Sequence, residues 1–162
     1  MQLDLREITK DNWEECAKLK VPEHQSAFTP SNAHSIAEAK FNPDLVPLAI
    51  YDGEEMVGLI VVSFDPNEGR AWIHRLMIDA DKQGKGYTRT TMKKMIGRLK
   101  QIEGCRKISV RWPTNSRTWE GFYSGFGFQP NGERSTEGVV IASIDVIPRT
   151  SAERDEGLQF RE

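Results

Sequence analysis

DADKQGKGYTRTTMKK (residues 79–94) is the stretch that decides the fold, because it places two glycines in a basic loop. The residues before it, RAWIHRLMI (70–78), are rich in β-branched and aromatic types and predict a strand. The residues after the loop predict a helix. The first turn of a helix has unpaired N–H groups and a partial positive charge, and glycine lets that backbone approach a phosphate closely. Strand, glycine loop and helix together predict a site for a phosphorylated ligand.

The composition is typical of a globular protein. The chain has 162 residues, of which 38% are hydrophobic and 28% charged, and this predicts one domain over residues 1–147 with a polar extension over 148–162. A net charge of −2 gives no overall reason to expect a nucleic acid partner. No basic and apolar leader follows Met1, and no apolar run has membrane-spanning length. We therefore expect a cytoplasmic protein that does not bind a membrane.

The chain contains two cysteines, Cys16 and Cys105. They are too few and too far apart for a disulfide framework, and they lack the paired spacing of a zinc site. Neither has a histidine close by in sequence that would indicate a nucleophile. We expect two partly buried small hydrophobic side chains and no metal.

Strands and helices alternate along the chain without an internal repeat. Asp11 and Glu14 resemble a capping box at the start of the first helix, and Asp52-Gly53 indicates a hairpin turn. After the glycine loop, four apolar residues share one helix face and predict core packing: Met92, Met95, Ile96 and Leu99. Strands are predicted at 3–8, 45–51, 56–64, 70–78, 106–112 and 138–147, and helices at 11–20, 35–41, after the loop, and at 118–126. This order predicts an α+β domain with a mixed, mostly antiparallel central sheet flanked by helices.

Two common nucleotide-binding patterns fit the glycine loop poorly. The P-loop requires GxxxxGK followed by Ser or Thr, and Gly84-Lys85-Gly86 has neither that spacing nor that order. The dinucleotide fingerprint GxGxxG fails because Arg89 stands three residues after Gly86. Both nucleotide interpretations are therefore weak.

The loop does match the pattern Gln/Arg-x-x-Gly-x-Gly/Ala from Gln83 onwards, except that Thr88 stands at the last place. A second pattern, Tyr-x-x-x-Gly-Phe, lies in FYSGFGF (122–128), with Tyr123, Gly127 and Phe128 in place. These two motifs, and the order of elements from residue 3 to 146, resemble the GNAT superfamily of N-acetyltransferases.

The resemblance implies the acyl-CoA N-acyltransferase fold, in which the strand over 70–78 splays from the next strand, and acetyl-CoA as co-substrate. It assigns the pantetheine arm to backbone groups of Leu76, Met77 and Ile78. The family asparagine position falls on Ser116, with Asn115 just ahead, and which of the two contacts CoA is left open. The pyrophosphate is assigned to the amides of Gln83, Gly84, Lys85, Gly86, Tyr87 and Thr88, with Lys82, Lys85 and Arg89 as exposed cations nearby.

The reaction implied is direct attack by an amine on the acetyl thioester. An alkylammonium titrates near pH ~10, so the site needs a base or a water path to one. By resemblance, Tyr123 donates a proton to the departing CoA thiolate. His74 is the candidate base or substrate contact, because an imidazole with a reference pKa of about 6.5 suits proton removal. The alternatives are a structural hydrogen bond by His74 and an acidic base nearby.

The early segment VPEHQSAFTPSNAHSIAEAK (21–40) resembles, in Gln25 and Phe28, the acceptor-side segment of bacterial diamine and polyamine acetyltransferases. A polyamine needs carboxylates along its groove, because each desolvated ammonium needs a counter-charge. Glu23 is the preferred candidate because it lies in this loop. The others are Glu14, Glu15 and Glu38.

Three functions are left open. The first is an acetyltransferase for a small primary amine such as a polyamine. The second is a related enzyme for an aminoglycoside, an amino acid or a peptide N-terminus, and the third is a non-catalytic acyl-CoA-binding module, to which the departures at Thr88 and Ser116 point. Many relatives dimerise, so a homodimer is an open expectation, and Leu158 and Phe160 are candidate docking points in the extension.

Overall fold

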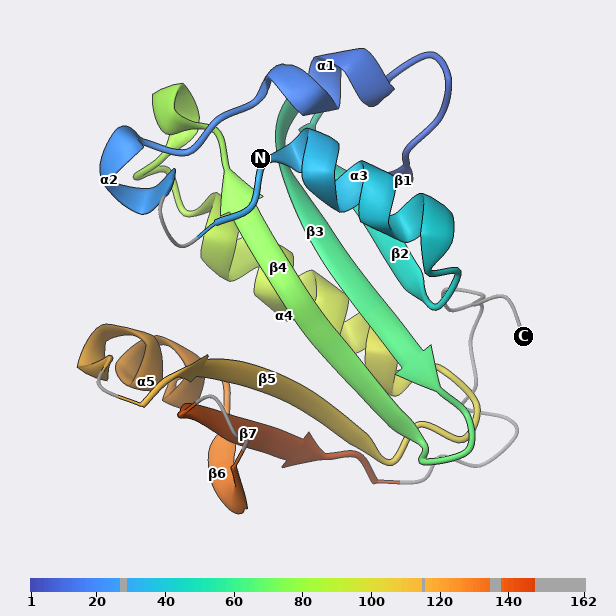
Figure 1. Ribbon diagram of the computed structural model, residues 1–162, viewed down its shortest axis with the longest axis vertical. Helices are drawn as coiled ribbons and strands as arrows, with labels where there is room; N and C mark the ends of the chain where they lie inside the picture. The colour runs from blue at the N-terminus through green and yellow to red at the C-terminus, as the bar shows by residue number, and fades with distance from the viewer. Residues whose placement is uncertain (27–28, 115, 135–137, 148–162) are drawn as a thin grey trace. The chain divides into compact units, whose positions relative to one another are not determined.

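Figure 1 shows the computed structural model, which describes residues 1–26, 29–114, 116–134 and 138–147. The strands are β1 (Leu3–Glu7), β2 (Leu45–Asp52), β3 (Glu55–Asp65), β4 (Arg70–Ile78), β5 (Lys107–Pro113), β6 (Gln129–Arg134) and β7 (Val139–Asp145). The helices are α1 (Trp13–Lys18), α2 (Glu23–Ser26), α3 (Asn32–Phe41), α4 (Tyr87–Lys100) and α5 (Arg117–Ser124), with a 3-10 turn at Ala80–Lys82. One sheet has the strand order β1-β2-β3-β4-β5-β7-β6, and the parallel pair in it is β4–β5. The predicted α+β class is confirmed.

The described chain divides into two compact units. The first contains residues 1–63 and 75–94, and the second contains residues 64–74 and 95–147. Strand β4 and helix α4 each begin in one unit and end in the other. The predicted extension over 148–162, with Leu158 and Phe160, lies outside the described residues.

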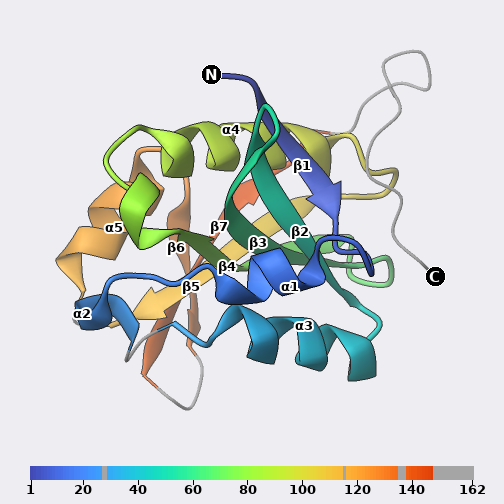
Figure 2. The same cartoon turned by 90° about the horizontal axis from the view of Figure 1, so that it is seen from above.

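In the first unit, β1, β2 and β3 form antiparallel pairs, with Leu5 opposite Ile50 and Leu48 opposite Ile60. Gly53 has φ 63° in the hairpin turn, as the Asp-Gly signal predicts. Figure 2 shows α1 and α3 side by side over β2 and β3. The core beneath them contains Cys16, Leu45, Ala49, Tyr51, Met56, Leu59, Val61 and Met77.

Strand β4 comes very close to β3 at Gly58. A Cβ atom at this position would lie 2.2 Å from the carbonyl oxygen of Met77. The register between β2 and β3 shifts here, since Ile50 pairs with Gly58 and Tyr51 with Met56, which leaves Val57 as an extra residue in β3. The Val57 carbonyl accepts a 2.8 Å hydrogen bond from the amide of Asp79, directly after β4. The bulge and the glycine together fix the end of β4 that leads into the glycine loop.

The second unit is built on β5 and β7, which pair antiparallel from Lys107 opposite Asp145 to Pro113 opposite Val139. Strand β4 joins them through a short parallel ladder, in which Arg70 to Trp72 pair with Lys107 to Ser109. Ile108, Val110 and Ala142 are fully buried. The apolar face predicted for α4 is confirmed, because Met92, Met95, Ile96 and Leu99 are all buried.

Three predictions about elements were wrong. Helix α1 begins after Asn12 rather than Asp11, and Asn12 makes no capping bond because its Oδ1 accepts from the amide of Thr9 instead. Residues 23–26, predicted as loop, form the short helix α2, and α3 begins at Asn32 with the Ser31 hydroxyl as its N-cap. Strand β6, sequence QPNGER, was not predicted. Its composition is typical of a turn, and pairing with β7 makes it a strand.

Both cysteines are buried, more fully than predicted: Cys16 is 0% and Cys105 is 5% exposed. Burial raises the pKa of the Cys16 thiol to about 11 and also raises the pKa of Cys105. Both side chains therefore behave as small apolar residues.

Candidate active site

The glycine loop joins β4 to α4 through residues 79–86. Gly84 has φ 80° and Gly86 has φ 86°, a region that other residues enter only with strain. A Cβ at either glycine would meet no atom within 4 Å, so the glycines are needed for backbone conformation. At the start of α4 the amide of Thr90 donates to the carbonyl of Gly86 at 3.1 Å, and the first turn of the helix has no acidic residue. Backbone donors of this kind can hold an anionic group such as a phosphate.

Two side chains tie this loop to the turn between β2 and β3. The Tyr87 hydroxyl donates a 2.7 Å hydrogen bond to Asp52 Oδ2. Lys82 Nζ lies 3.3 Å from Glu55 Oε1 and 3.8 Å from Asp79 Oδ2. The expectation that Lys82 is an exposed cation for the phosphate is therefore wrong: its side chain is 21% exposed and forms ion pairs within the protein. Lys85 is exposed on the loop.

The loop also contacts the expected acceptor segment. The side-chain amides of Gln25 and Gln83 bond in both directions, at 3.4 and 3.3 Å, and Gln83 Nε2 donates to the Ile78 carbonyl at 2.9 Å. Glu23 is exposed at the start of α2, and Phe28 lies outside the described residues. Gln25 of the acceptor segment and Gln83 of the loop are thus brought together.

Helix α3 is joined to the end of β4 by buried polar contacts. The Asn32 side chain donates to the Cys16 carbonyl at 2.9 Å and lies 3.4 Å from Met77 Sδ. Met77 and Ile78 are buried. Leu76 is half-buried in the same part of β4.

Glu38 of α3 was predicted as a candidate counter-charge for an ammonium. Its carboxylate lies 3.3 Å from Arg75 Nη2 and 3.5 Å from His34 Nε2, and Arg75 Nη1 donates to the buried Ser35 hydroxyl at 3.0 Å. Glu38 is therefore occupied by an ion pair that joins α3 to β4. Glu14 and Glu15 are exposed on α1.

In the second unit, Tyr123 lies in an aromatic cluster. Its ring stacks on Trp112 and Trp119, with centroids 5.4 and 5.8 Å apart, and meets Phe122 and Phe128 edge to face. Burial among these rings raises the pKa of Tyr123 to about 12. The phenol therefore keeps its proton at any ordinary pH, as a proton donor must.

The late motif has a clear structural reason. Gly127 has φ 95°, which turns the chain back after α5. The amide of Phe128 then donates to the Tyr123 carbonyl at 3.3 Å, and the Phe128 side chain is 1% exposed. The spacing Tyr-x-x-x-Gly-Phe thus fixes the position of the tyrosine through this hydrogen bond and the buried Phe128 ring.

His74 lies in a stack of aromatic and cationic groups. Arg111 Nη2 is 3.4 Å from His74 Nδ1. A guanidinium has only donors, so a hydrogen bond between these two atoms requires a neutral imidazole with its proton on Nε2. The Trp72 ring stacks on His74 and lies under the guanidinium groups of Arg70, at 4.3 Å, and Arg111, at 5.3 Å. In this tautomer Nε2 is a hydrogen-bond donor.

Ser116 is the N-cap of α5, where its hydroxyl accepts from the amide of Trp119 at 3.4 Å. Asn115, the alternative CoA contact, lies outside the described residues. Ser116 therefore has a structural role as the N-cap of α5.

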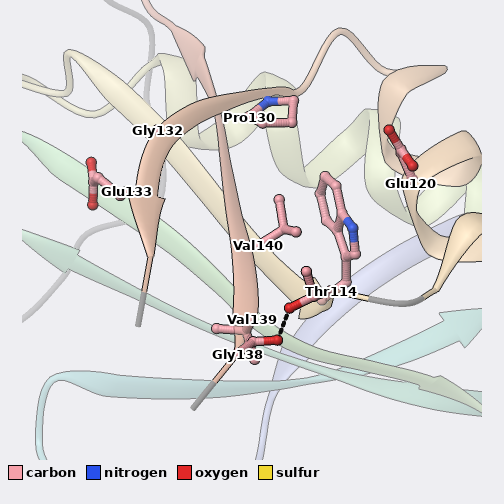
Figure 3. Close-up of a pocket in the computed structure, with 9 residues that line it drawn as sticks. Thr114, Glu120, Pro130, Gly132, Glu133, Gly138, Val139 and Val140 are labelled. Atoms are coloured by element: carbon pink, nitrogen blue, oxygen red, sulfur yellow. Dashed lines mark hydrogen bonds between the residues drawn. The ribbon is translucent and has the colours of Figure 1, made fainter. Parts of the chain in front are cut away.

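Sequence reasoning missed a cavity of about 300 Å³ in the second unit, between α5 and the β6–β7 pair. Figure 3 shows Glu120 on its α5 side and Glu133 on its β6 side, with a hydrogen bond from the Thr114 hydroxyl to the Gly138 carbonyl at its edge. Glu133 accepts from Arg70 Nη1 at 3.0 Å. The lining comes from four separate segments, so no local sequence signal marks the cavity.

Metal ligands and membrane spans can be judged for the described residues alone. Within them, no three side chains of the His, Cys, Asp and Glu types are grouped as metal ligands would be. Over the same ranges, none of the helices has both the length and the apolar character that a membrane span requires.

Comparison with known proteins supplies a family. The model of the "Acetyltransferase (GNAT) family" matches residues 6–128. A spermine/spermidine N(1)-acetyltransferase of Bacillus subtilis strain 168 is 28% identical over 147 residues, which are 87% of this chain and 97% of that protein. A probable spermine N(1)-acetyltransferase of Bacillus subtilis subsp. natto has the same identity and coverage.

Solved structures share the fold. A spermidine N-acetyltransferase from Vibrio cholerae, in complex with CoA and spermine, gives a TM-score of 0.70 at 17% identity and covers 90% of this chain and 96% of that one. The ribosomal-protein-S18-alanine N-acetyltransferase from Escherichia coli gives 0.68 at 14% identity, with 93% and 97% covered.

Proposed function

The chain belongs to the GNAT acetyltransferase family, whose enzymes use acetyl-CoA, and from this premise we propose that it acetylates a primary amine of a polyamine such as spermidine or spermine. The observation that carries the reaction is Tyr123, a phenol that its motif holds at the end of α5 in an aromatic cluster. The acceptor is supported by the two Bacillus relatives, which this chain matches over 97% of their length.

The transfer takes place in one step between bound partners. The amine nitrogen attacks the carbonyl carbon of the thioester, a C–N bond forms and the C–S bond breaks. The acceptor ammonium loses one proton to water before the attack. Tyr123 gives its proton to the CoA thiolate, and the proton that leaves the new amide nitrogen returns to the Tyr123 phenolate directly or through water. The amides of residues 83–88 hold the pyrophosphate, and backbone groups of Leu76, Met77 and Ile78 pair with the pantetheine arm.

His74 acts as a substrate contact in this proposal. Arg111 occupies Nδ1, so the proton on Nε2 makes His74 a donor rather than a base. A neutral donor on this strand suits the carbonyl oxygen of the acetyl group or a hydrogen-bond acceptor in the substrate.

The ammonium groups of the acceptor need carboxylates that the fold has not already paired. Glu38 is bound to Arg75 and is set aside. Glu23, exposed beside Gln25, stays the preferred counter-charge, and Glu120 at the cavity of the second unit is an added candidate. A cytoplasmic location and a homodimer stay predictions.

The test is release of free CoA thiol from acetyl-CoA against spermidine, spermine, putrescine, aminoglycosides and short peptides. We expect turnover with spermidine or spermine, and a loss of about 10²–10⁴-fold in kcat for Tyr123→Phe with CoA affinity unchanged. Tyr51→Phe, in the core of the first unit, is the matched control and should keep its activity.

A second candidate function has its own support. The fold is shared with the ribosomal-protein-S18-alanine N-acetyltransferase from Escherichia coli, whose acceptor is a protein, so a peptide is the second candidate acceptor. Turnover of an alanine-starting peptide, together with silence on every polyamine, would replace the proposed acceptor. If no acceptor in the panel turns over while CoA still binds, an acceptor outside the panel and the non-catalytic module are the two functions left.

A further inference from the structure

The turn between β2 and β3 holds the glycine loop at both ends. Lys82 precedes Gly84 and pairs with Glu55 at 3.3 Å, and Tyr87 follows Gly86 and donates to Asp52 at 2.7 Å. The two positive-φ glycines lie between these points. Since glycine has the widest conformational freedom of any residue, a loop of this kind needs external anchors to keep its amides in one arrangement.

The bond at the α4 end is the stronger anchor. Tyr87 is 7% exposed, and the 2.7 Å distance to a carboxylate is that of a charge-assisted hydrogen bond. This bond lowers the pKa of Asp52 and raises the pKa of Tyr87, as expected for a phenol that donates to a carboxylate. Asp52 is itself fixed, because its Oδ1 accepts from the amide of Gln2 at 2.9 Å.

The negative charge of Asp52 and Glu55 cannot itself attract a pyrophosphate. Asp52 and Glu55 place two carboxylates beside a loop that should bind a pyrophosphate, where negative charge opposes binding. A carboxylate at such a place has to contribute something that outweighs this repulsion. The contacts show what it contributes: Asp52 fixes the first residue of α4 and Glu55 fixes Lys82.

We propose that the β2–β3 turn is the support of the pyrophosphate loop, and that Asp52 is a positioning residue that raises the affinity for the CoA pyrophosphate through Tyr87 without contacting it. This inference rests on the proposed assignment of residues 83–88 to the pyrophosphate. It does not depend on which amine accepts the acetyl group.

The experiment compares two substitutions of Asp52 by calorimetry with CoA. Asp52→Ala removes the anchor and should raise the Kd of CoA by about ten-fold. Asp52→Asn removes the charge but keeps an oxygen that accepts from Tyr87, so its Kd should equal the wild-type value or be lower. Glu54→Ala is the matched control, because Glu54 is in the same turn with a side chain 96% exposed, and it should leave the Kd unchanged.

A truncated acetyl donor distinguishes loss of the loop's position from a general loss of structure. S-acetylpantetheine lacks the pyrophosphate, so Asp52→Ala should leave its KM unchanged while the KM of acetyl-CoA rises and kcat at saturation is kept. Tyr87→Phe should lose as much as Asp52→Ala, and the double variant no more than either alone. An equal loss with both donors, tighter CoA binding by Asp52→Ala, or additive losses would overturn the inference.

Gly86→Val distinguishes this inference from the site on which it rests. The φ of 86° at Gly86 is strained for valine, so CoA binding should weaken strongly. If Gly86→Val weakens CoA binding but Asp52→Ala does not, the loop assignment stands and the positioning role is wrong. If Gly86→Val folds and binds CoA normally, the loop assignment and the inference fail together.

Discussion

Gly58→Ala tests the claim that β4 is held at a fixed and very short distance from β3. The new Cβ would lie 2.2 Å from the Met77 carbonyl oxygen and 2.9 Å from Ile78 Cδ1. The methyl of Ile78 can rotate away, but the Met77 oxygen belongs to the backbone. A carbon and an oxygen in contact need about 3.3 Å, so the backbone of β4 must move by about 1 Å.

Overpacking of this kind costs about 1–3 kcal/mol of unfolding free energy. For a chain of 162 residues this corresponds to a fall in Tm of roughly 2–12 °C. The displaced segment carries Met77 and Ile78, whose backbone groups we assign to the pantetheine arm, so CoA affinity should fall as well.

Urea unfolding and calorimetry with CoA measure both effects. Gly97→Ala is the control, because Gly97 is exposed within α4 and a Cβ there meets no atom within 4 Å. Replacing such an exposed helical glycine by alanine should raise the free energy of unfolding by up to about 1 kcal/mol. If Gly58→Ala unfolds at the wild-type urea concentration and binds CoA as tightly, the close approach of the two strands is not a real constraint.

Three further predictions concern Tyr123, His74 and Gln25. Because burial raises the pKa of Tyr123 from 10 to about 12, the unfolded chain loses this proton first as pH rises, so stability should fall between pH 10 and 12, and urea unfolding should show a smaller fall in Tyr123→Phe. His74→Gln keeps an N–H donor near the place of Nε2 and should retain more kcat/KM than His74→Ala, and equal losses would contradict the donor role set by Arg111. Gln25→Leu should raise the KM of acetyl-CoA a few-fold by removing one of the two side-chain partners of Gln83, and the double variant with Gln83→Leu should lose no more than Gln83→Leu alone, whereas additive losses would mean that the two amides do not act through their mutual hydrogen bonds.

Features that depend on a short stretch of sequence could be predicted from the sequence. Two apolar runs on either side of Asp52-Gly53 specify the β2–β3 hairpin, and the two glycines before α4 specify a loop whose backbone has positive φ at both positions. The spacing from Tyr123 to Phe128 is recognisable as a motif in the sequence, and the hydrogen bond from the Phe128 amide to the Tyr123 carbonyl explains it. These features depend on neighbours within a few residues, so they can be read from short stretches.

Long-range pairing could not be predicted in the same way. Strand β6 exists because β7 offers it partners, and nothing in QPNGER indicates a strand. Asp52 and Tyr87 are 35 residues apart, and Glu38 and Arg75 are 37 apart, so no spacing rule connects them. Each of these contacts changes a role: Asp52 becomes a support for the loop, and Glu38 is removed from the candidates for binding an ammonium.

The burial of both cysteines has a practical consequence at the bench. A reagent that reacts with free thiols will find none on the folded chain, since Cys16 and Cys105 are 0% and 5% exposed and their raised pKa values keep them uncharged near neutral pH. Its signal during turnover therefore comes from released CoA alone. Once the chain unfolds, two thiols per molecule become reactive. The same reagent therefore measures turnover with the folded enzyme and, without acetyl-CoA, the fraction of unfolded molecules.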